Sequence, residues 1–215
     1  MIEYFNQNRD YILSLLGEHM WLALLPVLFG LLLALPLGYY AVRFGWLYHP
    51  LVNVSSLLYA IPSLALFALL PGIIGTRILD PINVIIALTL YSLALLVRTV
   101  ADGLQSVDVT VTQAATAMGY GRTRRLLAVE LPIAVPVIMA GVRVATVSNI
   151  SLVSVGALIG VGGLGQLFTR GIQLFYATPI LVGLVLSIAL AVLADLVLVL
   201  IQRAATPWTR VGTAR

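Results

Sequence analysis

Five stretches of the sequence are apolar, almost free of charge and long enough to cross a lipid bilayer. They cover residues 21–42, 51–74, 82–97, 133–159 and 179–201, and the short third stretch is expected to extend past Arg98. A transmembrane helix needs about 20 apolar residues. Hydrophobic residues make up 61% of the chain and charged residues 9%, against about 45–50% and about 25% in soluble domains. The sequence therefore predicts an all-α membrane protein, a polytopic bundle of about five transmembrane helices.

The remaining residues divide the chain into three parts. Residues 1–18 mix Phe5, Ile12 and Leu15 with polar side chains, which predicts an interfacial amphipathic segment. Residues 19–201 form a single transmembrane domain that includes a polar loop at 102–131, and residues 202–215 form a tail. The stretch 133–165 is longer than one span, so it is expected to be either a long kinked helix or a helix followed by a re-entrant turn.

The arginines predict the orientation of the chain. All twelve basic residues are arginine, and cytoplasmic loops carry the basic excess in membrane proteins. An outside N-terminus and a cytoplasmic C-terminus place eight arginines in the cytoplasm and three outside, and leave Arg143 within the fourth span. The cytoplasmic set is Arg43, Arg98, Arg122, Arg124, Arg125, Arg203, Arg210 and Arg215; the outer set is Arg9, Arg77 and Arg170.

Missing residue types limit the chemistry of the chain. It contains no cysteine and no lysine, which excludes a disulfide, a thiolate nucleophile and a P-loop lysine. His19 and His49 are isolated from one another and are interpreted as interfacial side chains rather than metal ligands. We therefore expect no catalytic residue, no metal site and no cofactor on this chain, and no enzyme activity; any ATP must be hydrolysed on a partner chain.

The polar stretch from Asp102 to Leu131 is far longer than a connection between neighbouring helices requires. A helix-favouring run at 113–118 is followed by Gly119 and Gly121, and then by a basic segment. This pattern predicts two short helices separated by a glycine break. Composition alone leaves two roles open: a knob for a partner's groove, or a loop whose arginines anchor to anionic head groups.

At this loop the sequence resembles the membrane subunits of binding-protein-dependent ABC importers. Their motif reads Glu-Ala-Ala, three residues, Gly, nine residues, Ile, one residue, Leu-Pro. The matching positions are Ala114, Ala115, Gly119, Val129, Leu131 and Pro132, while Gln113 replaces the family's Glu. The resemblance implies that this segment is an ATPase-coupling loop, in which the Gln113 exchange removes a charge and keeps the length of the side chain.

The resemblance covers essentially the whole chain. Residues 11–19, 139–143 and 160–165 look like the subgroup that imports osmoprotectants such as glycine betaine, carnitine, choline or proline. It implies a type I ABC importer-like permease in the cell (inner) membrane. The implied partners are an ATPase subunit, an extracytoplasmic solute-binding protein, a second copy or sister permease, and membrane lipid, with no nucleic acid.

Two alternatives remain at this point. Short permeases for another small solute, such as methionine, share the same loop. A secondary transporter or channel subunit would instead need ion-coupling carboxylates deep in the bundle, and only Asp195 is available there.

Arg143 and Asp195 are the two charges expected deep in the membrane. Arg143 follows Pro132 by eleven residues, which is about 16 Å along a helix and close to the bilayer centre. Because a lone charge at that depth is costly, we expect Arg143 and Asp195 to meet. Their pairing has two interpretations, a structural buried ion pair or a charge that lines the translocation path.

A run of glycines precedes the last span. It comprises Gly160, Gly162, Gly163 and Gly165. Irregular backbone near a membrane is tolerated inside protein or beside water. The run is therefore a candidate outer gate or a docking point for the solute-binding protein, or else a flexible turn before the last helix.

Overall fold

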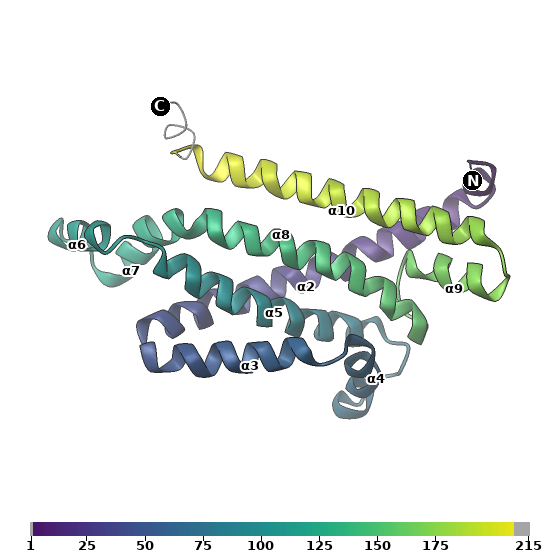
Figure 1. Ribbon diagram of the computed structural model, residues 1–215, viewed down its shortest axis with the longest axis horizontal. Helices are drawn as coiled ribbons and strands as arrows, with labels where there is room; N and C mark the ends of the chain where they lie inside the picture. The colour runs from purple at the N-terminus through teal and green to yellow at the C-terminus, as the bar shows by residue number, and fades with distance from the viewer. Residues whose placement is uncertain (1, 209–215) are drawn as a thin grey trace.

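The computed structural model describes residues 2–208, and within this range the chain forms helices and no β-strand. Figure 1 shows an elongated bundle with α6 and α7 at one end, α9 at the other, and α3 and α10 on opposite sides. The elements are α1 (Ile2–Gln7), α2 (Arg9–Arg43), η1 (Gly45–Leu47), α3 (Tyr48–Ala60), α4 (Ser63–Ile74), α5 (Pro81–Gln105), α6 (Val109–Ala117), α7 (Arg122–Arg125), the π-helical η2 (Leu126–Glu130), α8 (Leu131–Gly156), η3 (Ala157–Ile159), α9 (Gly165–Gln173) and α10 (Ala177–Ala205).

Four of the helical segments are long and apolar enough to cross a membrane, and there are five if the bent pair of α3 and α4 counts as one span. The prediction of an all-α bundle of about five spans is confirmed. The extension of the third span past Arg98 is also confirmed, because α5 continues to Gln105. Arg210 and Arg215 lie outside the described residues.

The N-terminal segment differs from the prediction. We expected an interfacial amphipathic segment over residues 1–18; in the structure only α1 is separate, and α2 runs without interruption from Arg9. One side of this region is covered by protein: Ile12 is fully buried, Leu15 is 3% exposed, and both belong to a cluster with Leu164 and Leu167, whereas Leu13 is 45% exposed. The amphipathic pattern therefore reflects a protein-facing side of the first spanning helix.

Small residues bring α2 close to α5. Ala34 is fully buried. A Cβ atom added to Gly30 would lie 2.6 Å from Cβ of Ser92, and one added to Gly38 would lie 2.6 Å from Cγ1 of Val100. Close approach of backbones is the usual way in which membrane helices gain packing energy.

The second predicted span is broken rather than continuous. α3 and α4 are bent by 99° at Ile61 and Pro62, because the residue before a proline is driven into an extended conformation. The carbonyl group of Ile61 that the break exposes accepts a hydrogen bond from the Tyr91 hydroxyl on α5. A freed backbone group within a membrane is therefore satisfied by a neighbouring helix.

The region 133–165 forms a helix followed by a turn. α8 begins at Leu131 with Pro132 in its first turn and ends at Gly156. The chain then makes a 3-10 turn and a glycine turn before α9. Two alternatives were predicted for this region, a long kinked helix or a helix followed by a re-entrant turn. The structure is nearer to the helix followed by a turn, and the turn packs against other helices.

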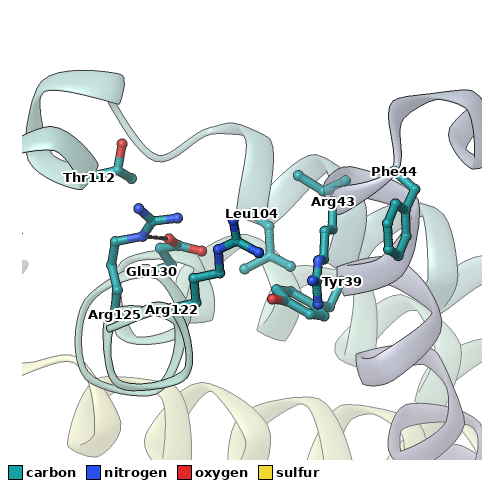
Figure 2. A pocket seen from close by; sticks show the side chains of 9 residues that line it. Tyr39, Arg43, Phe44, Leu104, Thr112, Arg122, Arg125 and Glu130 are labelled. Carbon is teal, nitrogen blue, oxygen red and sulfur yellow. Dashed lines mark hydrogen bonds and ion pairs between the residues drawn. The ribbon is translucent and has the colours of Figure 1, made fainter. Parts of the chain in front are cut away.

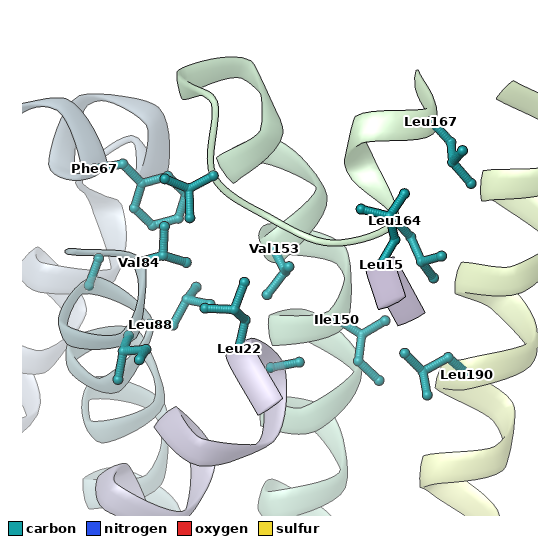
Figure 3. Packing of buried hydrophobic residues seen from close by; sticks show 14 of the residues in the cluster. Leu15, Leu22, Phe67, Val84, Leu88, Ile150, Val153, Leu164, Leu167 and Leu190 are labelled. Carbon is teal, nitrogen blue, oxygen red and sulfur yellow. The ribbon is translucent and has the colours of Figure 1, made fainter. Parts of the chain in front are cut away.

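Two apolar clusters hold the bundle together. The first, shown in Figure 3, gathers Leu15, Leu22, Leu88 and Val153 around the end that carries α9. The second lies nearer the polar loop and includes Leu96, Val100 and Ile138 from α5 and α8. The outer side of α10 contributes to neither, and its large apolar side chains are exposed in the isolated chain, as expected of a helix that faces lipid.

Candidate functional site

The polar loop folds as two short helices around a glycine turn, as the sequence predicts. Asp108 caps α6: its Oδ1 accepts hydrogen bonds at 2.8 Å from the Thr110 backbone N–H and from the Thr110 hydroxyl. These two bonds lower the pKa of the Asp108 carboxyl, the backbone bond contributing most. The helix ends before Gly119, whose φ of +84° is a left-handed conformation that suits glycine.

The residues of the loop motif divide into a packed group and an exposed group. Ala115 is 2% exposed, whereas Gln113 and Ala114 are exposed. Val129, Leu131 and Pro132 are half-buried where η2 joins α8. The motif therefore supplies one internal contact, a turn and a junction with the bundle, and it leaves α6 accessible to a partner.

One face of α6 is apolar and exposed. Val111, Ala114 and Met118 are spaced three and four residues apart, so they lie on the same side of the helix. The exposed fractions are 37% for Val111 and 70% for Met118. An apolar helical stripe of this kind fits a hydrophobic groove on another protein.

Arg125 braces the two helices of the loop, a role that the sequence analysis missed. Its Nε donates to Glu130 Oε1 at 2.6 Å, and its Nη1 donates to Thr116 Oγ1 at 2.9 Å. One side chain therefore connects α6, α7 and η2. The five-residue separation of Arg125 and Glu130 gave no signal, because on a regular α-helix that spacing does not place two side chains together; the π-helical segment η2 changes the register.

The glycine run forms a buried turn against α2 and α8. Val161 and Leu164 are 3% and 0% exposed. A Cβ atom on Gly163 would lie 2.5 Å from Cβ of His19, and Gly163 has a φ of +38°. In the described structure, the run is a packed segment rather than a loose turn.

His19 holds this turn in place and corrects the expectation that it is an interfacial side chain. It is fully buried. Its Nδ1 accepts the Leu164 backbone N–H at 3.2 Å, so Nε2 carries the proton and donates to the Ile150 carbonyl group at 2.9 Å. The imidazole links α2, α8 and the glycine turn, whereas His49 is exposed.

Arg143 and Asp195 meet across α8 and α10. Arg143 Nε donates to Asp195 Oδ1 at 2.6 Å, and Nη2 donates to Oδ2 at 2.8 Å. This is the bidentate geometry that makes arginine–carboxylate pairs strong. In the isolated chain the side chains are 36% and 34% exposed, so the pair is half-buried rather than buried, because α10 covers only one side of it.

A polar groove lies between α3 and α5, on the side of the bundle away from α10. Its volume is about 400 Å³, and Ser55, Ser56, Tyr59, Arg98 and Asp102 line part of it. Tyr48 donates a hydrogen bond at 2.8 Å to Asp102, which is one of the lining residues. Serine, tyrosine and charged side chains next to one another are unusual on a lipid-facing surface.

A second cavity, of about 650 Å³, lies beside the glycine turn. It is lined by α2, η3 and α9 residues that include Tyr11, Gly160, Gln166 and Arg170. The Arg170 guanidinium lies 5.5 Å from the centre of the Tyr11 ring. The two ends of the bundle thus offer different surfaces: an exposed apolar helix face at one end and a concave surface of mixed polarity at the other.

These features define a multi-spanning membrane permease with an exposed helical loop at one end. The chain matches the family described as "Binding-protein-dependent transport system inner membrane component" over residues 12–207. It belongs to this family and is therefore a transport permease subunit of the inner membrane.

Curated relatives match over nearly their full length. The chain is 36% identical to the osmoprotectant import permease protein OsmW of Salmonella typhimurium, covering 96% of this chain and 97% of that protein. It is 35% identical to the glycine betaine/carnitine/choline transport system permease protein OpuCD of Bacillus subtilis, covering 95% and 88%. Identity to the choline transport system permease protein OpuBD of the same organism is 34%, covering 96% and 91%.

Solved structures agree with the fold. An inward-facing structure of the MetNI methionine ABC transporter superposes with a TM-score of 0.82 at 23% identity, covering 91% of this chain and 96% of that chain. An amino acid ABC transporter superposes with a TM-score of 0.71 at 18% identity, covering 95% and 96%. These likenesses establish a type I ABC permease fold.

Proposed function

We propose that this chain forms the membrane pathway of an ABC importer for osmoprotectants of the quaternary ammonium class, such as glycine betaine, carnitine or choline, with proline as a further candidate. The observation that carries the proposal is the identity of 34–36% to permeases named for these solutes, over 95–96% of the chain. The resemblance to a methionine transporter is lower in sequence, at 23%, and supports the fold alone.

The apolar face of α6 is the contact for an ATPase subunit. Val111, Ala114 and Met118 present a continuous apolar stripe at the end of the bundle, and Arg125 keeps the underlying helices in one arrangement. A helix that is braced in this way can transmit a displacement of the ATPase to α8, which begins directly after η2. ATP hydrolysis belongs to that partner.

The orientation that fits this role has the polar loop and the C-terminus in the cytoplasm. The three arginines of α7 then lie on the basic side of the membrane. The opposite end, with its cavity at Tyr11, Gln166 and Arg170, faces outward and receives the solute-binding protein. The glycine turn that borders this cavity acts as a fixed part of the outer gate, because His19 secures it to α2 and α8.

The solute path follows the groove between α3 and α5, and the Arg143–Asp195 pair has a structural role. The neighbourhood of Asp195 on α10 is exposed and apolar, with Val192 and Leu196 among its members, which is typical of a surface in lipid. The α3–α5 groove instead offers hydroxyl groups and the face of Tyr59. Aromatic faces attract quaternary ammonium groups, and a second permease, either a copy or a sister chain, closes the groove.

Transport by reconstituted vesicles tests the proposed function. Vesicles that contain this chain, its ATPase and its binding protein should accumulate labelled glycine betaine, carnitine or choline only when ATP is enclosed with the ATPase. Labelled methionine serves as the comparison. ATP-driven uptake of methionine without uptake of any quaternary ammonium compound or proline would contradict the proposal.

A further inference from the structure

A cavity of about 500 Å³ opens where the end of α2 meets the polar loop, and we call it the arginine cavity. Figure 2 shows Arg43 entering it from α2 and Arg122 from α7, on facing sides. Its lining residues are Tyr39, Val42, Arg43, Phe44, Leu104, Thr112, Arg122, Arg125 and Glu130. The volume is in the range of ligand sites, which is about 300–1,000 Å³.

The charges of the arginine cavity do not balance. Three arginines and one carboxylate line it, and Glu130 is engaged by Arg125 at 2.6 Å. Within residues 2–208, neither Arg43 nor Arg122 forms an ion pair with a carboxylate. The guanidinium of Arg43 lies 5.1 Å from the centre of the Phe44 ring, and the C-terminal end of α2 favours a cation there, but neither contact supplies an anion for Arg122.

An apolar groove continues from the arginine cavity and shares two of its walls. Tyr39 and Leu104 line both spaces. The groove has a volume of about 320 Å³, and its other lining residues are Leu35, Pro36, Tyr40, Leu126, Leu127 and Leu131. A doubly positive cavity therefore lies directly beside an apolar groove, at the C-terminal end of the spanning helix α2.

We propose that these adjoining spaces bind one anionic phospholipid, with its phosphate between Arg43 and Arg122 and an acyl chain in the apolar groove. Guanidinium groups bind phosphate oxygens in a bidentate manner. The paired polar and apolar spaces favour a lipid over a free anion or an acidic peptide, since a free anion leaves the apolar groove empty and the groove is lined by residues of the spanning helix α2. Basic pockets between membrane helices are known to bind anionic head groups.

The position of this lipid gives it a regulatory role. Its phosphate connects the last residue of α2 to α7, which is the part of the polar loop that Arg125 joins to α6. An occupied site fixes the loop against the bundle, and an empty one leaves two like charges facing each other. Anionic lipid should therefore stabilise the loop arrangement independently of which solute is transported.

Lipid-dependent thermal stability of the purified permease–ATPase complex tests this proposal. In detergent, added phosphatidylglycerol should raise the unfolding midpoint of the complex. Phosphatidylcholine, glycerol phosphate and inorganic phosphate at equal concentrations should not, because the first lacks net charge and the others lack acyl chains. An equal rise with glycerol phosphate or inorganic phosphate would assign the cavity to a free anion and contradict the lipid proposal.

The matched variants are Arg122→Gln, the double variant Arg43→Gln with Arg122→Gln, and the control Arg124→Gln, whose side chain lies over the Tyr120 ring outside the cavity. The double variant should need at least about tenfold more phosphatidylglycerol for the same rise, which corresponds to about 1.4 kcal/mol. The single Arg122→Gln variant should lose part of the response to phosphatidylglycerol. It should fold normally, because Arg122 is exposed. Unchanged responses in both, or a loss in Arg124→Gln as large as in the double variant, would overturn the proposal. None of these readouts involves uptake, so they are independent of the proposed solute.

Discussion

Arg143 on α8 and Asp195 on α10 form a bidentate ion pair with donor–acceptor distances of 2.6 and 2.8 Å. α8 and α10 are in contact along the bundle. The pair joins the helix that continues from the polar loop to a helix whose outer side faces lipid. A charge that loses its partner at such a place has no water to replace it.

We therefore predict that Arg143→Leu and Asp195→Leu each lower the thermal unfolding midpoint of the purified permease, and that the double substitution recovers part of the loss. Removing one partner leaves an uncompensated charge, whereas removing both leaves two apolar side chains in contact. Uptake should recover with stability, because the pair has a structural role. Additive destabilisation would show that the pair contributes nothing, and a stable double variant without uptake would place the pair in the solute path.

Substitutions at Gly119 test the turn of the polar loop, and the neighbouring Gly121 serves as the control. Gly119→Ala should destabilise the turn by about 1–2 kcal/mol, the usual cost of a left-handed conformation for a residue with a side chain. The bulkier Gly119→Leu should uncouple ATP hydrolysis from uptake while insertion remains normal. Gly121 has a φ of −66° and, like Gly119, has open space around it. Gly121→Ala should therefore keep coupling, and equal defects at both positions would contradict a conformational requirement at Gly119.

Gln113 lies exposed on α6, where the family motif has a glutamate. Gln113→Glu should preserve assembly, since both side chains have the same reach and suit a helix. Gln113→Ala should weaken it modestly, by a few-fold in the affinity for the ATPase. Copurification with a tagged ATPase measures the effect. An alanine variant that retains the ATPase as well as the parent chain would mean that Gln113 makes no significant contact.

His19→Ala should destabilise the glycine-turn end of the bundle by about 2–4 kcal/mol, because it creates a cavity and leaves the Leu164 N–H without its acceptor. His49→Ala, at an exposed position, is the matched control and should have little effect. Hydrogen exchange resolved by segment should show faster exchange at residues 160–165 in the His19 variant alone. Equal protection of residues 160–165 from exchange in both variants would contradict the conclusion that His19 holds the glycine turn in place.

The sequence predicts the spans well because the length of each apolar stretch is a property of the chain itself. It also predicts the Arg143–Asp195 contact, since a charge deep in an apolar helix restricts its own partners. The sequence did not predict the burial of His19. Because His19 lies at the edge of an apolar run, we expected an interfacial side chain. Its burial depends on Gly163, distant in sequence and small enough to lie against the imidazole.

Other features depend on geometry that a linear pattern does not contain. The 99° bend at Ile61 and Pro62 requires Tyr91 to satisfy the freed carbonyl group, so proline alone predicts a kink and not its size. The Arg125–Glu130 contact requires a π-helical register. The arginine cavity requires Arg43 and Arg122, which are far apart in sequence, to converge at one end of the bundle.

Cross-linking from single cysteines tests the central claim, that α6 docks the ATPase and the opposite end faces the binding protein. The chain has no native cysteine, so an introduced thiol reports one site. Met118→Cys on α6 and Phe175→Cys between α9 and α10 replace side chains that are 70% and 98% exposed. In membranes that contain all partners, a thiol-anchored photo-cross-linker at position 118 should capture the ATPase, and the same reagent at position 175 should capture the binding protein. Capture of the binding protein from position 118, or of the ATPase from position 175, would contradict the account.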